Sequence, residues 1–253
     1  MSVGLVNLGA ITVPGSGRML ANQTFTALAR DRSWKSSREG RAGCVEASVL
    51  TVEGDPARVE SRLVSGRIDC PGCSRGLRPW GWARPRRVHG IGVVLRPRRA
   101  RCPGCLLTHV LLPVTVLLRR GYAVEVIGAA LAARARGSGH RPIGRALGVP
   151  AATVRGWLRV MSGRLGPART VLLQVAARAG VDWVVPTAQG CRWRDLLAAL
   201  AAAWEAVVGR FGRLGVLGPV TGWQVAVACS GGRLLAPGWP SGGPSRSGNT
   251  SCP

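Results

Sequence analysis

The sequence is short of acidic residues and has almost no lysine. Its 253 residues include 11 Asp plus Glu against 35 Lys plus Arg, and Lys35 is the only lysine, so the formal net charge is +24. Arginine in place of lysine is typical of a GC-rich genome, which accounts for part of the arginine content but not for the shortage of acids. A chain this basic repels basic partners and attracts polyanions such as nucleic acid or anionic lipid.

Long apolar runs are also missing, since none reaches the roughly 18 residues of a membrane-spanning helix. Segment 106–118 is interrupted by His109 and Pro113, and charged residues bracket the alanine-rich segment near residue 200. The N-terminus does not have the pattern of a secretory signal. We therefore expect a cytoplasmic, nucleoid-associated protein with no membrane partner. In that reducing compartment the eight cysteines are metal ligands or free thiols rather than disulfides.

The expected fold class is mainly α with a small β zinc ribbon. Residues 1–58 mix Gly, Ser and Arg without a sustained period, which predicts a poorly ordered N-terminal arm. Residues 62–118 contain short β-prone pieces at 88–95, 100–102 and 108–112, punctuated by Pro and Gly, which predicts the ribbon. Residues 233–253 are rich in Gly, Pro and Ser, so we expect a disordered tail.

Helical periodicity begins near residue 119, where apolar residues recur three and four positions apart. The residues on this face are Val124, Ile127, Gly128, Leu131 and Ala135. Two shorter helices, expected at 142–147 and 151–161, complete a trihelical helix-turn-helix domain over 119–165. Further helices at 168–179, 192–211 and 220–229 would form a C-terminal helical region over 166–232. We expect its apolar faces to pack together or to form a homodimer.

One tetrapeptide, Cys-Pro-Gly-Cys, occurs at 70–73 and again at 102–105. Two residues between cysteines let one tight turn aim both sulfurs at a single ion, and two such turns complete the tetrahedral shell that zinc prefers. Proline and glycine favour that turn. The alternative is buried or free thiols, and the 28-residue interval between the pairs exceeds the usual ~15–20 residues. We predict one structural Zn²⁺, with the ligands Cys70, Cys73, Cys102 and Cys105.

The other cysteines and two nearby histidines do not have ligand spacing. We interpret Cys44, Cys191, Cys229 and Cys252 as free thiols. His89 and His109 lie near the paired cysteines, but four sulfurs already close the zinc shell, so we expect both to be polar strand residues.

Residues 84–101 contain seven arginines and no acid. A solvated basic face is the simplest interpretation. Because Trp80 and Trp82 lie beside this run, it could instead follow a phosphate backbone. The expected phosphate-binding residues here are Arg98, Arg99 and Arg101.

Residues 140–161 have the pattern of a helix-turn-helix. Gly148 can take the left-handed conformation that ends the first helix, Val149 can enter the core, and Pro150 suits the start of the second helix. The expected inward-facing residues are Ile143, Ala146, Leu147, Val149, Val154, Trp157, Leu158 and Met161. An ordinary helical hairpin is the alternative, and Gly156 costs about 1 kcal/mol relative to alanine inside a helix.

In a helix-turn-helix the second helix enters the major groove of double-stranded DNA with its N-terminal part nearest the bases. The expected base-reading residues are Ala151, Ala152 and Arg155. An arginine can bind guanine through two hydrogen bonds, so Arg155 is the principal reader. The expected phosphate-binding residues of this domain are Arg141, Arg145 and Arg159.

The order of these motifs resembles a known family. Two CPGC pairs around a basic strand region, followed by GVPAATVRGWLR at 148–159, are similar to the zinc-ribbon and helix-turn-helix head of bacterial insertion-sequence transposases. The chain resembles still more closely uncharacterised helix-turn-helix proteins of GC-rich, actinobacterial-type bacteria, which carry a stretch similar to 105–122. The resemblance covers 62–165 and implies binding to DNA ends or operators, with the four paired cysteines as zinc ligands.

Those transposases carry a catalytic domain built around three acidic residues, and this chain departs from them there. The only acids after the helix-turn-helix are Asp182, Asp195 and Glu205. Two-metal phosphoryl transfer needs carboxylates that converge from a sizeable fold, so we expect no catalysis. The leading hypothesis is a zinc-stapled DNA-binding protein, either a transcriptional regulator or a non-catalytic transposase-derived protein. The alternatives are a functional or degenerate transposase or nuclease, and an RNA-binding zinc-ribbon protein.

Overall fold

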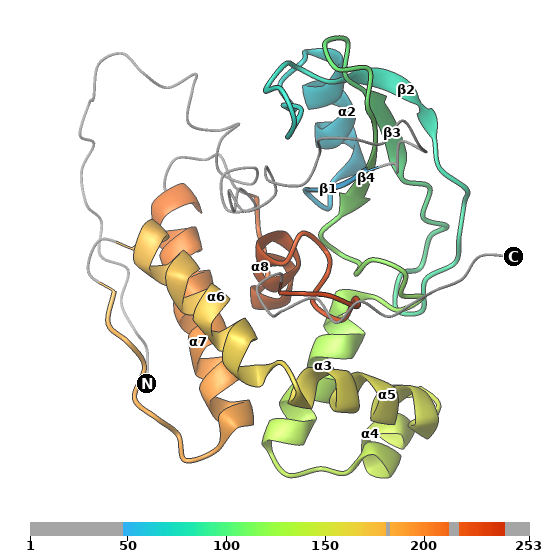
Figure 1. Ribbon diagram of the computed structural model, residues 1–253. Coiled ribbons are helices and arrows are strands. Elements are labelled where there is room, and N and C mark those ends of the chain that lie inside the picture. The colour runs from blue at the N-terminus through green and yellow to red at the C-terminus, as the bar shows by residue number, and fades with distance from the viewer. Residues whose placement is uncertain (1–47, 181–182, 213–217, 241–253) are drawn as a thin grey trace, which may run out of the picture.

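The protein is described by a computed structural model that covers residues 48–180, 183–212 and 218–240. This part of the chain is mainly α with a small β part, as expected. The sheet lies at one end of the molecule and α3, α4 and α5 at the other (Figure 1). Most of the expected N-terminal arm, residues 1–47, and tail residues 241–253 lie outside the described residues.

The sheet has four strands in the order β1-β4-β3-β2. The strands are β1 (Ser48–Val52), β2 (Arg78–Trp82), β3 (Arg98–Arg101) and β4 (Thr108–Pro113). β4 pairs in parallel with β1 and antiparallel with β3, and β2 pairs antiparallel with β3. Helix α2 (Pro56–Val64) begins at Asp55, whose Oδ1 accepts a hydrogen bond from the backbone N–H of Ala57 at 2.9 Å. It adds Val59 and Leu63 to the core of the sheet.

The folded structure begins earlier than the sequence pattern predicts. Residues 48–58, expected to belong to a poorly ordered arm, instead form β1 and the start of α2. The prediction is wrong here because the partner of β1 is distant in sequence: Ser48 pairs with His109. The expected strand at 88–95 is also wrong, since this segment makes only isolated bridges. The strand β2 contains Pro79 and Gly81, which local strand propensity disfavours.

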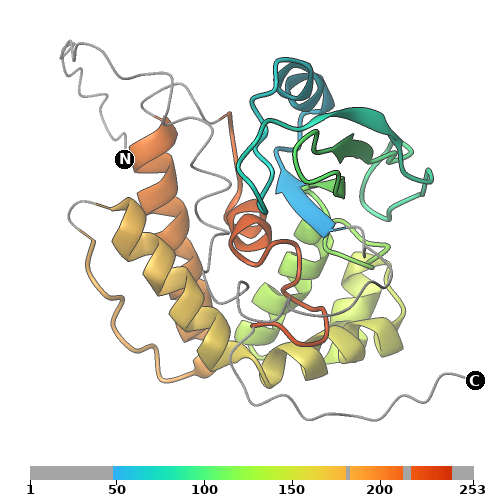
Figure 2. The same cartoon turned by 45° about the horizontal axis from the view of Figure 1, so that its top comes forward.

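Six helices build a second, larger core. They are α3 (Val124–Ala135), α4 (His140–Leu147), α5 (Ala151–Ser162), α6 (Leu165–Ala179), α7 (Arg192–Val207) and α8 (Gly222–Cys229). A π-helical turn, Val208–Gly212, follows α7. All five residues of the expected apolar face of α3 are buried, which confirms that prediction. Helices α6 and α7 lie side by side, and both views place α8 between them and the sheet (Figures 1 and 2).

Residues 233–240 belong to the helical core and not to a disordered tail. Leu234 and Leu235 are buried. The guanidinium groups of Arg120 and Arg164 donate hydrogen bonds to the carbonyls of Leu235 at 2.6 Å and Leu234 at 3.0 Å. The prediction is wrong for this segment because it relied on Gly and Pro content. The segment is ordered by two buried leucines, whose carbonyls accept hydrogen bonds from arginines far away in sequence.

A long segment between β2 and β3, residues 83–97, joins the sheet to the helices; we call it the β2–β3 connection. It runs from the sheet to the start of α3 and returns (Figure 1). Its two sides are hydrogen bonded to each other: Arg86 and Leu95 each donate a backbone N–H to the carbonyl of the other at 2.9 Å. At its turn, His89 donates to the carbonyl of Gly121 at 2.9 Å and accepts from the N–H of Ala123 at 2.8 Å. The sheet is therefore fixed to the N-terminus of α3.

We expect Gly128→Ala to destabilise the protein by about 1–3 kcal/mol, because overpacking a core forces neighbouring side chains to move. A Cβ at Gly128 would lie 2.3 Å from Nε1 of Trp223, which packs α8 against α3. Gly156→Ala is the matched control: no atom lies within 4 Å of its added Cβ, so it should gain about 1 kcal/mol of helix propensity. Denaturant unfolding measures the change in the free energy of unfolding of each variant. A loss of stability in both variants would contradict the packing argument.

Candidate metal centre and nucleic-acid interface

The two cysteine pairs converge at one end of the sheet, as the repeated tetrapeptide predicts. The sulfurs of Cys70, Cys73, Cys102 and Cys105 all lie within 4.8 Å of one another and could hold a metal ion. The shortest distances join Cys73 Sγ to Cys102 Sγ at 3.3 Å and Cys70 Sγ to Cys105 Sγ at 3.5 Å. Each of these contacts joins one pair to the other, so the four sulfurs form a single cluster.

The two cysteine turns have the same backbone geometry. In each, the N–H of the first cysteine donates to the carbonyl five residues later, with Cys70 to Arg75 at 2.8 Å and Cys102 to Leu107 at 2.9 Å. The residue after the second cysteine is left-handed in both turns, with φ of 59° at Ser74 and Leu106. Repetition of this conformation explains how two separate segments present their sulfurs to one point.

The sulfurs differ in how readily they ionise. Burial raises the pKa of the Cys70 thiol to about 12. Burial also raises the pKa of Cys102, but hydrogen bonds from the backbone of Cys105 and from the Cys73 sulfur outweigh it and bring that pKa to about 6. Thiolate is the metal-binding form of cysteine, so a cation at the centre of the cluster would favour ionisation of its sulfurs.

His109 is buried beside the cluster, a role that the sequence pattern did not indicate. Its Nε2 lies 3.5 Å from the Cys70 sulfur, and its Nδ1 is hydrogen bonded to Oγ of Ser48. Burial lowers the pKa of His109, so the neutral ring carries one N–H. With that hydrogen on Nε2, the ring donates to the sulfur and accepts from the serine hydroxyl. His109, on β4, therefore contacts and orients the Cys70 sulfur and is not merely a polar strand residue.

The remaining cysteines divide between the core and the surface. Cys229 packs against the helical core, and burial raises its pKa to about 12. Cys191 is partly exposed just before α7. Cys44 and Cys252 lie outside the described residues. His89 is exposed on the β2–β3 connection, with its ring centroid 5.3 Å from that of Tyr122.

The expected basic face of the sheet carries exposed tryptophans stacked with arginines. The guanidinium carbon of Arg101 lies 4.5 Å from the ring centroid of Trp80, and that of Arg98 lies 4.5 Å from Trp82. The exposed fractions of Trp80 and Trp82 are 53% and 47%. Exposed aromatic rings beside arginines can stack with bases, which makes this edge of the sheet a candidate contact for unpaired nucleic acid.

Arg98 is already engaged within the sheet. Its Nε and Nη2 donate to both carboxylate oxygens of Glu60, at 2.8 and 3.0 Å, and its Nη1 donates to the carbonyl of Gly81 at 2.7 Å. All three guanidinium nitrogens of Arg98 therefore have partners within the protein, and a phosphate would compete with them. Arg99 is half-buried with a buried Nε that has no partner among the described residues, and Arg101 donates to the carbonyl of Leu106 at 3.4 Å.

The corner between α4 and α5 has the predicted local geometry. Gly148 ends α4 with φ of 62°, Val149 is buried and α5 follows Pro150. Ile143, Val154, Trp157 and Met161 are buried as expected, while Leu147 and Leu158 are partly buried. Ala146 is exposed, so the prediction that it faces inward is wrong. The buried residues of α4 are Ile143 and Gly144, and Ala146 lies next to the face that they form.

The residues expected to contact DNA lie on an open face of α4 and α5. The exposed members are Arg141, Arg145, Ala152, Arg155 and Arg159, and Ala151 is half-exposed. Behind this face, Trp157 packs edge-on against Tyr122 with ring centroids 4.9 Å apart. Since Tyr122 also contacts His89, a row of three rings links the β2–β3 connection to α5. The structure therefore holds α5 in a fixed position relative to the connection.

Comparisons with known proteins do not assign the chain: no family model, curated protein or solved structure matches it. Among the described helices, none is both long and apolar enough to cross a membrane.

We expect Leu106→Gly to stabilise the protein by about 1 kcal/mol, because a left-handed conformation costs an L-residue roughly 1–2 kcal/mol that glycine avoids. The side chain of Leu106 is 61% exposed, so little packing is lost. Leu106→Ala is the control, because it removes the same side chain and keeps the Cβ. Denaturant unfolding should show a gain for glycine only. An equal gain with alanine would show that the backbone angle is not the cause.

Proposed function

We propose that the chain is a zinc-stapled helix-turn-helix protein that binds double-stranded DNA, as a transcriptional regulator or a non-catalytic relative of a transposase. The observation that carries the proposal is the α4–Gly148–α5 corner, whose outer face presents four exposed arginines in a chain of net charge +24. A basic helix on an open face is the element that enters the major groove in this class of protein.

Zinc is the ion that the sulfur cluster fits best. A tetrahedral Zn²⁺ with Zn–S bonds of about 2.3 Å separates its sulfurs by about 3.8 Å. The two closest pairs of sulfurs lie at 3.3 and 3.5 Å, and all four lie within 4.8 Å. Four cysteine ligands leave no position for substrate, so the ion would hold the turns together and would not take part in a reaction.

The proposed division of roles on DNA follows from exposure. Arg155, Ala152 and Ala151 lie at the N-terminal half of α5, where base edges are reached, and Arg155 would bind guanine. Arg141, Arg145 and Arg159 would hold phosphates around them. A homodimer would match a palindromic site, so a palindrome in the selected sequence would indicate that the protein binds as a two-fold symmetric dimer.

A second candidate, binding of unpaired nucleic acid such as RNA, is favoured by one observation. Trp80 and Trp82 expose about half of their surface, at 53% and 47%, beside stacked arginines. Aromatic stacking on bases is typical of single-strand binding.

We expect the purified protein to contain one zinc ion per chain and the double variant Cys73→Ser, Cys105→Ser to lose it and unfold the sheet. His109→Ala should weaken zinc binding by about 10–100-fold, because groups that support metal ligands have effects of that size. Cys191→Ser is the control and should retain zinc. Native mass spectrometry and chelator competition measure these outcomes. A folded, metal-free wild-type chain would rule out the zinc assignment.

We expect selection from random duplex DNA at near-physiological salt, with single-stranded RNA as competitor, to recover a sequence motif. Arg155→Ala should lose about 1–3 kcal/mol of discrimination at one base pair and keep most of its non-specific binding. Arg178→Ala removes the same charge from an exposed site on α6 and should keep the motif.

The opposite results would overturn the proposal. An unchanged motif with Arg155→Ala would show that α5 does not read the site. Recovery of no motif, with binding transferred to the RNA competitor, would favour the second candidate instead.

A further inference from the structure

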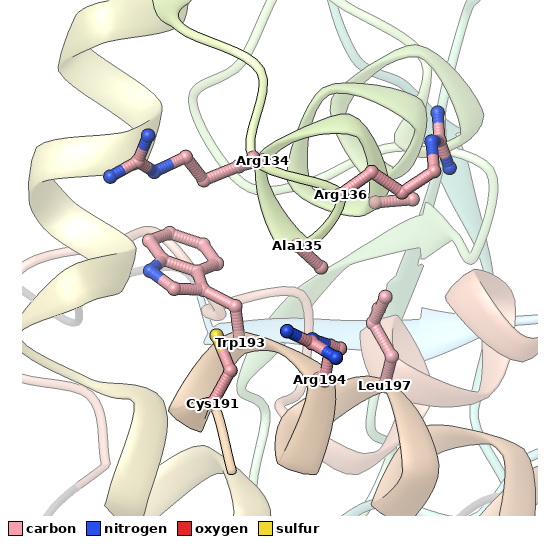
Figure 3. A pocket seen from close by; sticks show the side chains of 9 residues that line it. Arg134, Ala135, Arg136, Cys191, Trp193, Arg194 and Leu197 are labelled. Carbon is pink, nitrogen blue, oxygen red and sulfur yellow. The ribbon is translucent and has the colours of Figure 1, made fainter. Parts of the chain in front are cut away.

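A pocket lies between the end of α3 and the first turn of α7 (Figure 3). Its volume is about 620 Å³, within the range of about 300–1,000 Å³ that is typical of small-molecule sites. Its side-chain lining combines charged and apolar groups from both helices and their flanks. The residues that matter here are Arg134, Arg136, Cys191, Trp193, Arg194 and Leu197.

The charge of the pocket is entirely positive. Three arginines line it, and no carboxylate is among its described lining residues. The nearest acid in sequence is Asp195, whose Oδ1 accepts a hydrogen bond from the backbone N–H of Gln189 at 2.6 Å. Arg134 donates to the carbonyl of Ser138 at 3.5 Å, which leaves most of its guanidinium donors for another acceptor.

The behaviour of Cys191 gives separate evidence that this position favours negative charge. Cys191 immediately precedes the 16-residue helix α7. Hydrogen bonds from the backbone N–H groups of Arg194 and Trp193 lower its pKa, so they stabilise the thiolate. The positive end of the helix dipole therefore adds to the positive charge that the arginines give this pocket.

The Trp193 indole gives the pocket a planar apolar surface. Figure 3 shows Trp193 and Leu197 rising from α7 towards the end of α3, while Arg194 lies beside α7 and Arg136 is directed away from it. Arg134 extends on the same side as the Trp193 indole. An aromatic or otherwise planar ligand could therefore lie on the indole with its anionic group between Arg134 and Arg194.

We propose that the pocket between α3 and α7 binds a small organic anion with a planar apolar part. This inference goes beyond the proposed DNA-binding function and does not depend on it. The site touches α3, which packs against α4 and α5, and α7, which packs against α6. A ligand here would bridge the helix-turn-helix and the α6–α7 pair, which is the position of an effector.

The test uses 8-anilino-1-naphthalenesulfonate as the probe and N-phenyl-1-naphthylamine, the same ring system without the sulfonate, as the neutral comparison. Alkylation of Cys191 by iodoacetamide, followed peptide by peptide with mass spectrometry, gives a readout at the pocket itself. At ten times its dissociation constant the sulfonate should slow this alkylation about tenfold, because only the unbound chain reacts. The neutral compound should give little protection.

In the variants Arg134→Ala and Arg194→Ala, the sulfonate concentration that halves the rate of Cys191 alkylation should rise about tenfold, since each variant removes a charge-assisted hydrogen bond. Arg178→Ala is the matched control and should behave as wild type. Protection is compared with and without probe in each variant, because Arg194 also affects the Cys191 thiolate directly.

Equal protection by the neutral compound, or equal weakening by Arg178→Ala, would show general adhesion to a basic protein and overturn the proposal. The absence of protection at Cys191 would do the same. The assay contains no DNA, so its result is independent of the outcome of the DNA selection.

Discussion

The convergence of four sulfurs is the constraint on which the sheet depends. Cys70 and Cys102 are buried in its core among the side chains of Leu50, Leu63, Ile68, Leu77 and Leu111. A unit of this size gains little stability from apolar burial alone, so the proposed ion, which would cross-link two segments far apart in sequence, would have a large effect. The second cysteine turn also lies between β3 and β4, and β4 is the strand to which β1 adds. The position of every strand is therefore tied to the sulfurs.

The parts of the structure that could be predicted from the sequence depend on neighbours along the chain. The repeated Cys-Pro-Gly-Cys turns, the buried face of α3 and the left-handed Gly148 are each defined within a few residues. The parts that could not be predicted depend on distant partners. β1, Ser-Val-Leu-Thr-Val, has local strand propensity, but its pairing with β4 joins residues 61 positions apart, and Ser48 reaches the cluster only through His109. The pairing of Arg98 with Glu60, 38 residues apart in sequence, is of the same kind.

Positive charge has two opposing effects in this molecule. With 35 basic and 11 acidic residues, the folded chain repels itself as well as attracting polyanions. Among the described residues the ion pairs Glu53–Arg62 and Glu60–Arg98 both lie in the sheet and its helix, so the helices gain no such compensation from described carboxylates. A bound polyanion would relieve the repulsion in the folded state. The proposed binding of nucleic acid would therefore raise folding stability by mass action.

The packing of residues 225–235 sets the order in which the protein can fold during synthesis. The N–H of Leu118 donates to the carbonyl of Gly232 at 2.8 Å, and α8 and Leu235 fill the centre of the helical core. These residues leave the ribosome long after the strands and both cysteine turns. The sheet has all of its own partners by then, whereas α3, α5 and α6 remain without the segment that closes their core. The nascent chain therefore exposes an open helical half from the emergence of α3 until the emergence of α8 and Leu235, when the strands of the sheet already have their partners.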